Sequence, residues 1–378
     1  PTANAKSFYP EGTPKHKQKS SDHCAPFGLA SAGGVATAYK GTGAITNVNI
    51  GFVYNRIADF NQTTAFASLG NPGTESLANI FCTLANVDGL KTNNDGTMPF
   101  GNDPFYWGTT LAYKNGLINK DDEGWFIDRI DADLAEIDQY SAVETRGSLG
   151  EYALTIGLNF RDVVYVGASL GIPSLNYKQT VFYGEDYIYA PGNEPSGEVM
   201  PYQLTYMNYE QRTRITGTGF NFKIGVTARP VDWLRIGVAY HTPTYYSLSL
   251  RYGGDMWSGT YSAGNNPEDY DINRNGYMYD NVGTPIWEDA GPNSWNFRSP
   301  SRLMVGAAVT LAKRIIVSAD YERSWYQSIR LQQSPILGLS YTDSMKTYFK
   351  GSNTLRVGAE LRPLPAVALR AGYGVTDS

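Results

Sequence analysis

Cysteine, charge and long apolar runs are all scarce in this chain, and each scarcity excludes a class of protein. The 378 residues include only two cysteines, too few for a disulfide-rich scaffold and without the spacing of a zinc site. Charged residues make up 18% of the chain and give a net charge of −5, without the basic stripe that a nucleic-acid partner needs. No window holds the roughly 20 apolar residues of a membrane-spanning helix, which excludes a helical membrane protein.

Glycine and aromatic residues are plentiful instead. The chain contains 40 glycines, 28 tyrosines and 7 tryptophans, a composition typical of turn-rich β structure with aromatic surfaces. Its mean hydropathy of −0.35 also fits a transmembrane barrel, because lipid-facing side chains occupy only alternate positions of each strand. The sequence starts at Pro1 without a basic or apolar leader, so we expect any secretory signal to lie outside it.

Apolar and polar residues alternate along much of the chain from Ser148 onward. In residues 152–160 the even positions are apolar and most odd positions are polar, which puts the two sets on opposite faces of a strand. The same alternation recurs in residues 220–227, 234–252, 303–311 and 355–362. In the second of these stretches we expect one set to face lipid and the other the lumen: Leu234, Ile236, Val238 and Tyr240 against Arg235, Gly237 and His241.

The length of these strands favours a membrane barrel over a soluble β-sandwich, which is the alternative. Sandwich strands run about 5–6 residues, whereas residues 234–252 exceed the roughly 9–11 residues that cross a bilayer. We expect the surplus to project outside the membrane.

The connections alternate between short and long, as in outer-membrane barrels with short periplasmic turns and long extracellular loops. Short connections are expected at residues 41–44, 161–162, 229–232, 312–313 and 363–365, and long ones at 57–147, 179–200, 253–292 and 328–350. From a weak strand near Ser7 we count eleven strands. Because a closed single-chain barrel has an even number, we expect further strands beyond Ser378.

Several segments together resemble one known family. They are residues 47–56 (NVNIGFVYNR), 145–151 (TRGSLGE), 171–173 (GIP), 217–244 (GTGFNFKIGVTARPVDWLRIGVAYHTPT), 298–322 and 353–373. In these segments the chain resembles the FadL/TodX family of outer-membrane transporters for fatty acids and aromatic hydrocarbons. The resemblance implies an all-β fold, a transmembrane antiparallel β-barrel of about 14 strands when complete, with long extracellular loops that contain short helices.

The chain departs from that family at both ends. The N-terminal hatch of the family, with its Gly-rich stretch and Asn-Pro-Ala motif, is not legible between Pro1 and Gly34. Three closing strands are expected to be missing after Ser378. Residues 1–378 are therefore interpreted as a single barrel domain without its hatch and its last strands.

One short helix is predicted in the long loop at residues 57–147. Leu77, Ile80, Phe81 and Leu84 fall at positions i, i+3, i+4 and i+7, which makes one apolar stripe. The resemblance implies that this stripe lines an external groove where a lipid-like ligand docks. The alternative is a loop that packs on itself.

A partial calcium motif lies in the long loop at residues 253–292. Asp271, Asn273 and Asn275, followed by a glycine, fit the first half of a calcium loop, in which side-chain oxygens recur at alternate positions. The twelfth position is Val282 rather than an acid, although Asp280 could substitute. Calcium is therefore the one cofactor considered, against the alternative of a plain polar loop.

Cys24 and Cys82 fall in the first and second long loops, on the same predicted extracellular side. Since outer-membrane proteins pass through an oxidising periplasm, we expect a disulfide between them, against the alternative of two unpaired thiols.

These features favour a passive channel for small hydrophobic molecules, long-chain fatty acids or similar lipids and hydrocarbons, in the outer membrane of a Gram-negative bacterium. Its expected partners are membrane lipids and a hydrophobic ligand, with no nucleic acid. No enzyme is expected, because His16, His23 and His241 stand apart from any nucleophile context. The alternatives are a barrel adaptor that binds an outer-membrane protein of a secretion machine, and a general porin.

Overall fold

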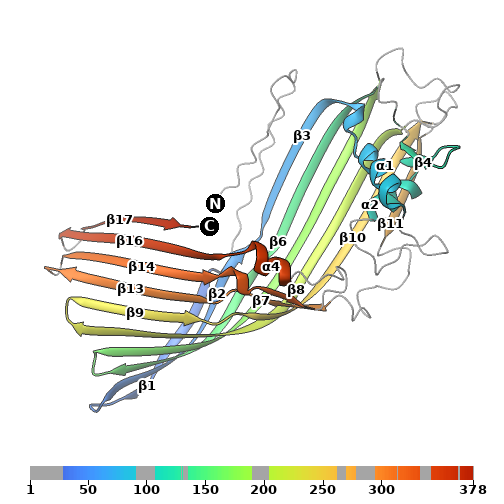
Figure 1. The fold of residues 1–378 in the computed structure, drawn as a ribbon. Helices are drawn as coiled ribbons and strands as arrows, with labels where there is room; N and C mark the ends of the chain where they lie inside the picture. The colour runs from blue at the N-terminus through green and yellow to red at the C-terminus, as the bar shows by residue number, and fades with distance from the viewer. Residues whose placement is uncertain are drawn as a thin grey trace.

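The computed structural model describes residues 29–90, 107–128, 130, 135–189, 204–261, 270–277, 294–312, 314–332, 342–364 and 367–377. Strands dominate these residues, and Figure 1 shows most of them joined in one large curved sheet, with the helices α1 (Leu77–Asp88) and α2 (Trp107–Lys114) near one end and α4 (Thr342–Tyr348) near the middle. Among the described residues, none of the helices has both the length and the apolar character needed to cross a membrane.

The main sheet contains 15 strands in the part of the chain that the structure describes, and every pairing within it is antiparallel. Its principal order is β1-β2-β6-β7-β8-β9-β13-β14-β16-β17. The bounds are β1 (Ser31–Lys40), β2 (Ile45–Asp59), β6 (Ala135–Phe160), β7 (Val164–Tyr189), β8 (Leu204–Val231), β9 (Leu234–His241), β13 (Arg302–Leu311), β14 (Ile315–Trp325), β16 (Gly351–Leu364) and β17 (Val367–Thr376). The all-β expectation and the antiparallel order are confirmed.

Several strands are interrupted once and then continue along the same neighbour, in part through residues that were expected to be loops. β3 (Gln62–Pro72) continues β2 along β6, and β10 (Tyr245–Tyr261) continues β9 along β8. In the same way β12 (Ser294–Arg298) precedes β13, and β15 (Arg330–Gln332) follows β14 after the short helix η4 (Tyr326–Ser328). The interruptions at residues 242–244, 299–301 and 326–329 lie on neighbouring strands. We call this line the crease, and Figure 1 shows the strands running in different directions on its two sides.

The two faces of the sheet differ as the alternation predicts. We call the face on which α1 and α2 pack the inner face and the opposite one the outer face. We call the part of the sheet below the crease, toward the short turns at residues 41–44 and 161–162, the lower sheet. Apolar side chains on its outer face are exposed, with Leu154 at 55% and Val238 at 46%. The register pairs Val226 with Val238 and Val238 with Val305, so these side chains form a continuous apolar band. Lys223, His241 and Arg302 are paired on the inner face, and Arg235 shares it.

Above the crease the strands extend further than the sequence predicts. Residues 135–147 and 179–189 belong to β6 and β7 and pair with each other, although both stretches were expected to be loops. β10 continues to Tyr261 and pairs with β11 (Tyr270–Tyr277) inside another expected loop. The short turns at residues 41–44 and 161–162, by contrast, are confirmed. We call this upper part of the sheet, with its β3 edge, the extension. The expected strand near Ser7 lies outside the described residues.

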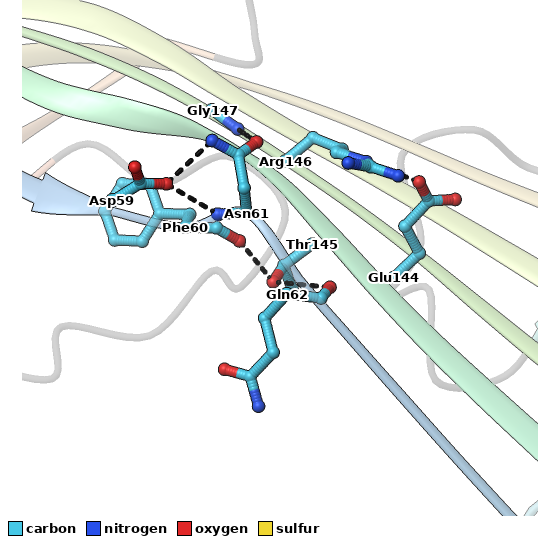
Figure 2. Close-up of polar contacts among 8 residues, drawn as sticks. All are labelled: Asp59, Phe60, Asn61, Gln62, Glu144, Thr145, Arg146 and Gly147. Carbon is cyan, nitrogen blue, oxygen red and sulfur yellow. Dashed lines mark hydrogen bonds and ion pairs between the residues drawn. The ribbon is translucent and has the colours of Figure 1, made fainter. Parts of the chain in front are cut away.

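The junction between β2 and β3 is held by polar contacts to β6 (Figure 2). Asn61 donates to the Asp59 carboxylate from its backbone N, at 3.0 Å, and from its side-chain amide, at 2.7 Å. Asn61 also accepts a bond from the backbone N of Gly147 at 3.2 Å, and the Thr145 hydroxyl donates to the Phe60 carbonyl at 2.5 Å. The chain therefore passes from the lower sheet into the extension without losing its attachment to β6.

A small cap covers the inner face of the extension. It consists of α1 (Leu77–Asp88), α2 (Trp107–Lys114) and the hairpin of β4 (Ile118–Lys120) and β5 (Phe126–Asp128). The hydrophobic core of the described protein lies between this cap and the sheet. Its fully buried members from the cap include Leu111, Leu117 and Ile118, and those from the sheet include Ile137, Met207 and Met256.

Candidate functional site

The inner face carries a row of paired charges near the crease, which we call the polar belt. Glu151 is only 4% exposed and forms an ion pair with Lys223. The Asn221 side-chain amide donates to Glu151 at 2.8 Å and to the Thr244 hydroxyl at 3.2 Å. A buried carboxylate is tolerated only when it is paired and hydrogen-bonded, and Glu151 meets both conditions.

The belt continues across the next strands. Lys223 is paired in register with His241, and His241 with Arg302. Glu322 on β14 then receives Arg302 at 3.7 Å and Arg356 at 3.1 Å. The basic residues of the belt are thus flanked by Glu151 on one side and Glu322 on the other, so the belt is polar but nearly compensated.

A cavity of about 510 Å³ opens beside the belt on the inner face. Small residues form its floor, because Gly157, Gly167, Gly225 and Ala239 are successive neighbours across four strands. A Cβ added at Gly157 would meet nothing within 4 Å, so the backbone there borders open space. Lys223 and His241 of the belt line the same cavity.

Helix α1 carries two apolar stripes rather than the single predicted one. Ala78, Phe81, Cys82 and Ala85 face the sheet and are buried, and the Phe81 ring packs edge-on against Tyr209 with centroids 6.1 Å apart. The other stripe is uncovered or half-covered and contains Leu77, Ile80, Leu84 and Val87, of which Ile80 is 53% and Val87 76% exposed. The structure thus separates Phe81 from the other three predicted ligand residues, whose role stays a prediction.

The N-terminus of α1 is fastened to the sheet by a buried carboxylate that the sequence did not single out. Glu185 of β7 is 0% exposed and accepts five hydrogen bonds. The donors are Ser76 Oγ at 2.5 Å, Leu77 N at 2.8 Å, Gln139 Nε2 at 3.1 Å, Tyr183 OH at 2.5 Å and Tyr187 OH at 2.8 Å. Because the positive end of the helix dipole lies at its N-terminus, the carboxylate also suits this position electrostatically.

The remaining predicted sites are placed only in part. Cys82 is buried in the cap core at 7% exposure, but Cys24 lies outside the described residues, so the disulfide stays a prediction. Asp271, Asn273 and Asn275 lie in β11, paired with β10, rather than in a wrapped loop, and Asp280 lies outside the described residues. Calcium binding at these positions also stays a prediction.

The chain is thus a large antiparallel sheet protein with an apolar outer face, a polar inner face and a helical cap, an arrangement suited to the wall of a membrane barrel. It is similar to the toluene transporter TodX of Pseudomonas putida, with 10% identity over 92% of this chain and 72% of that chain at a TM-score of 0.35. It is also similar to the toluene transporter TbuX of Ralstonia pickettii, with 13% identity over 67% and 68% at 0.28.

At these TM-scores neither likeness bears on the fold or the function of this chain, both of which rest on its own residues. No protein-family profile and no curated protein matches the chain.

Proposed function

We propose that this protein is a passive outer-membrane channel for small apolar molecules. The outer face supports the membrane placement. Below the crease β9, β13 and β14 have 8, 10 and 11 residues, close to the roughly 9–11 that cross a bilayer. The large apolar side chains of this face, Ile236 among them, are exposed and would contact lipid.

The observation that carries the proposal is the uncovered apolar stripe of α1. An apolar side chain that remains exposed on a folded surface marks an interaction site when it is part of a larger patch. Near the stripe the cap exposes two more large apolar side chains, Trp125 at 57% and Ile127 at 47%. The cap lies on the inner face of the extension. The cavity beside the polar belt lies further along the same face, so an apolar molecule would pass the cap on its way to the cavity. An apolar molecule would therefore dock on the stripe before it enters.

The polar belt and the cavity beside it favour the passage of an apolar ligand over its tight binding. Conduction requires that binding be weak enough for release. The floor of the cavity is formed by glycines and an alanine, with compensated charges at its upper edge, so it offers an apolar molecule few contacts. We infer that long-chain fatty acids and aromatic hydrocarbons, in the outer membrane of a Gram-negative bacterium, are the substrate classes to test first.

The test compares two double variants in cells that produce the full chain. Ile80→Ser with Val87→Ser removes the exposed stripe, and Thr83→Ser with Asp88→Ser changes exposed polar positions of the same helix. We expect uptake of labelled oleate or toluene to fall severalfold in the first and to stay unchanged in the second, with heat-resistant gel migration preserved in both. Equal uptake in the two would contradict the proposal, and swelling of protein-containing liposomes in small sugars would indicate a general porin instead.

The adaptor alternative is favoured by one specific observation. On the outer face of the extension, the rings of Tyr140, Phe182 and Trp257 form a row with successive centroids 6.0 Å apart. Aromatic residues are enriched where proteins meet. Changing Phe182 to Ser should leave uptake unchanged under the channel proposal, and it should release a bound outer-membrane protein under the adaptor alternative.

A further inference from the structure

Two arginines stand directly opposite each other on the outer face just above the crease. Arg298 ends β12 and Arg330 begins β15, and the two are register partners across antiparallel strands. Arg298 is also paired with Tyr245, and Tyr245 with Phe220. Since paired residues of an antiparallel ladder share a face and Phe220 and Tyr245 are 58% and 44% exposed, both guanidinium groups belong to the outer face.

Neither arginine has a carboxylate partner among the described residues. Arg330 donates from Nη1 to the backbone carbonyls of Gln327 at 3.0 Å and Ile329 at 2.7 Å. The Arg298 guanidinium lies over the Tyr245 ring, 5.5 Å from its centroid, and its Nε is buried without a hydrogen-bond partner. Like charges directly opposite in a ladder are destabilising, and no acidic side chain of the described residues compensates this pair.

A cavity of about 490 Å³ lies beside the two guanidinium groups. Its lining includes the stacked rings of Phe220 and Tyr245, 5.4 Å apart at an interplanar angle of 22°, together with Ser247 and Asn296. The apolar band of the outer face begins directly below, at Phe222 on β8 and Tyr240 on β9. Aromatic side chains are typical of the level at which lipid headgroups meet the hydrocarbon region.

We propose that Arg298 and Arg330 bind the phosphate headgroup of a membrane lipid whose acyl chains lie along the apolar band. Guanidinium groups match phosphate oxygens in a bidentate geometry, which suits an unpaired Nε beside a second arginine. The site faces outward beside the band, so a phosphate attached to acyl chains fits it better than free phosphate. The inference rests on the membrane placement of the proposed function but not on any transported molecule.

The test measures lipid binding to the detergent-solubilised full chain by native mass spectrometry. The probes are phosphatidic acid and diacylglycerol with identical acyl chains, which differ only in the phosphate. The variant is Arg298→Gln with Arg330→Gln. The control is Arg146→Gln, an exposed arginine of β6 that is ion-paired with Glu144. Because hydrogen bonds between a guanidinium group and a phosphate are stronger than those between neutral groups, we expect at least a roughly tenfold preference for phosphatidic acid in the unaltered chain and the control, and none in the double variant.

Two outcomes would overturn the proposal. Retention of the preference in the double variant would place the phosphate elsewhere, and displacement of phosphatidic acid by millimolar inorganic phosphate would indicate a site for free anions. Uptake of oleate or toluene should stay unchanged in the double variant, so failure of the lipid site and failure of the channel proposal are separately visible. Heat-resistant gel migration confirms that each variant is folded.

Discussion

At the residue scale, two of the hydrogen bonds to Glu185 depend on the phenol groups of Tyr183 and Tyr187 remaining protonated. Burial raises the pKa of Tyr187 and of Tyr183 well above the usual range of tyrosine, and the neighbouring Glu185 carboxylate raises both further. Both phenols therefore stay protonated and keep donating to the carboxylate. Oε1 of Glu185 accepts three of the five hydrogen bonds and Oε2 accepts the other two, so both oxygens of this buried side chain are satisfied.

Replacing Glu185 with Gln should release the start of α1 from the sheet. The amide keeps the shape of the side chain, but its NH2 group would face donors that need an acceptor, which leaves buried hydroxyls unsatisfied. We expect a loss of about 2–4 kcal/mol in the local stability of the cap, measured as faster amide hydrogen exchange in α1. Glu144→Gln, at an exposed ion pair with Arg146, is the matched control. Equal protection of α1 in both variants would contradict this role of Glu185.

The Cys82 thiol should be unreactive as long as the cap is folded. Burial, with a smaller contribution from the Asp128 carboxylate, raises the pKa of Cys82 to about 12. Because only the thiolate reacts, very little of the reactive form exists at pH 8, and reactivity should rise only as the pH approaches 12. In a Cys24→Ser variant, which leaves Cys82 as the one cysteine, we expect iodoacetamide to label denatured protein and to spare folded protein for hours. Prompt labelling of the folded chain would show that the cap opens.

At the scale of single elements, the junction between β2 and β3 depends on the backbone of β6. Gly147 has φ +113°, a region that side-chain-bearing residues rarely adopt. A Cβ at this position would lie 2.0 Å from the Asn176 carbonyl oxygen on β7. Figure 2 shows Gly147 beside Asn61, at the point where β2 passes into β3.

Gly147→Ala should therefore destabilise the chain by more than about 1 kcal/mol, the lower bound of the usual cost of such backbone strain. The measurement is the temperature at which the heat-resistant form is lost on gels. Gly157→Ala on the same strand is the control, because its Cβ would enter open space and the transition should not move. A similar shift in both variants would mean that the glycine at 147 is not required where β2 passes into β3.

Periodicity predicted the elements of the lower sheet well and those of the extension poorly. In β9 the alternation of apolar and charged residues is sharp, because one face meets the apolar band and the other the polar belt. In residues 179–189 polar and apolar side chains are mixed on both faces, so the strand was expected to be a loop, although tertiary pairing with β6 and β8 makes it a strand. The role of Glu185 could not be predicted either, because its donors come from segments up to 111 residues apart.

The helix α1 shows a different limit of pattern reasoning. Its existence and its apolar character follow from spacing, and the structure confirms a helix at Leu77–Asp88. Two stripes overlap on it, however, and spacing does not decide which one is buried. The stripe that contains Phe81 is buried because Tyr209 and the cap core meet it there, and that contact comes from β8, far along the chain.

At the scale of the whole molecule, the two faces of the lower sheet should respond oppositely to an added charge. Val238 lies near the middle of the outer apolar band, between Val226 and Val305, whereas Thr227 lies one position away on the inner face beside Gly237. An arginine on the lipid face of a barrel near the midplane costs about 2–4 kcal/mol, because the charge must leave water. An arginine on the inner face remains hydrated and next to the polar belt.

Val238→Arg should therefore lower the free energy of unfolding in lipid vesicles by about 2–4 kcal/mol, while Thr227→Arg should change it by well under 1 kcal/mol. The measurement is reversible unfolding of the full chain in vesicles with urea, followed by tryptophan fluorescence. Equal losses would mean that the outer face does not contact lipid, and with it the membrane placement, the channel proposal and the lipid site would all fail. A loss confined to Val238→Arg would place the hydrocarbon region of the membrane on the apolar band. The phosphate of a bound lipid would then be held just above that band, at Arg298 and Arg330.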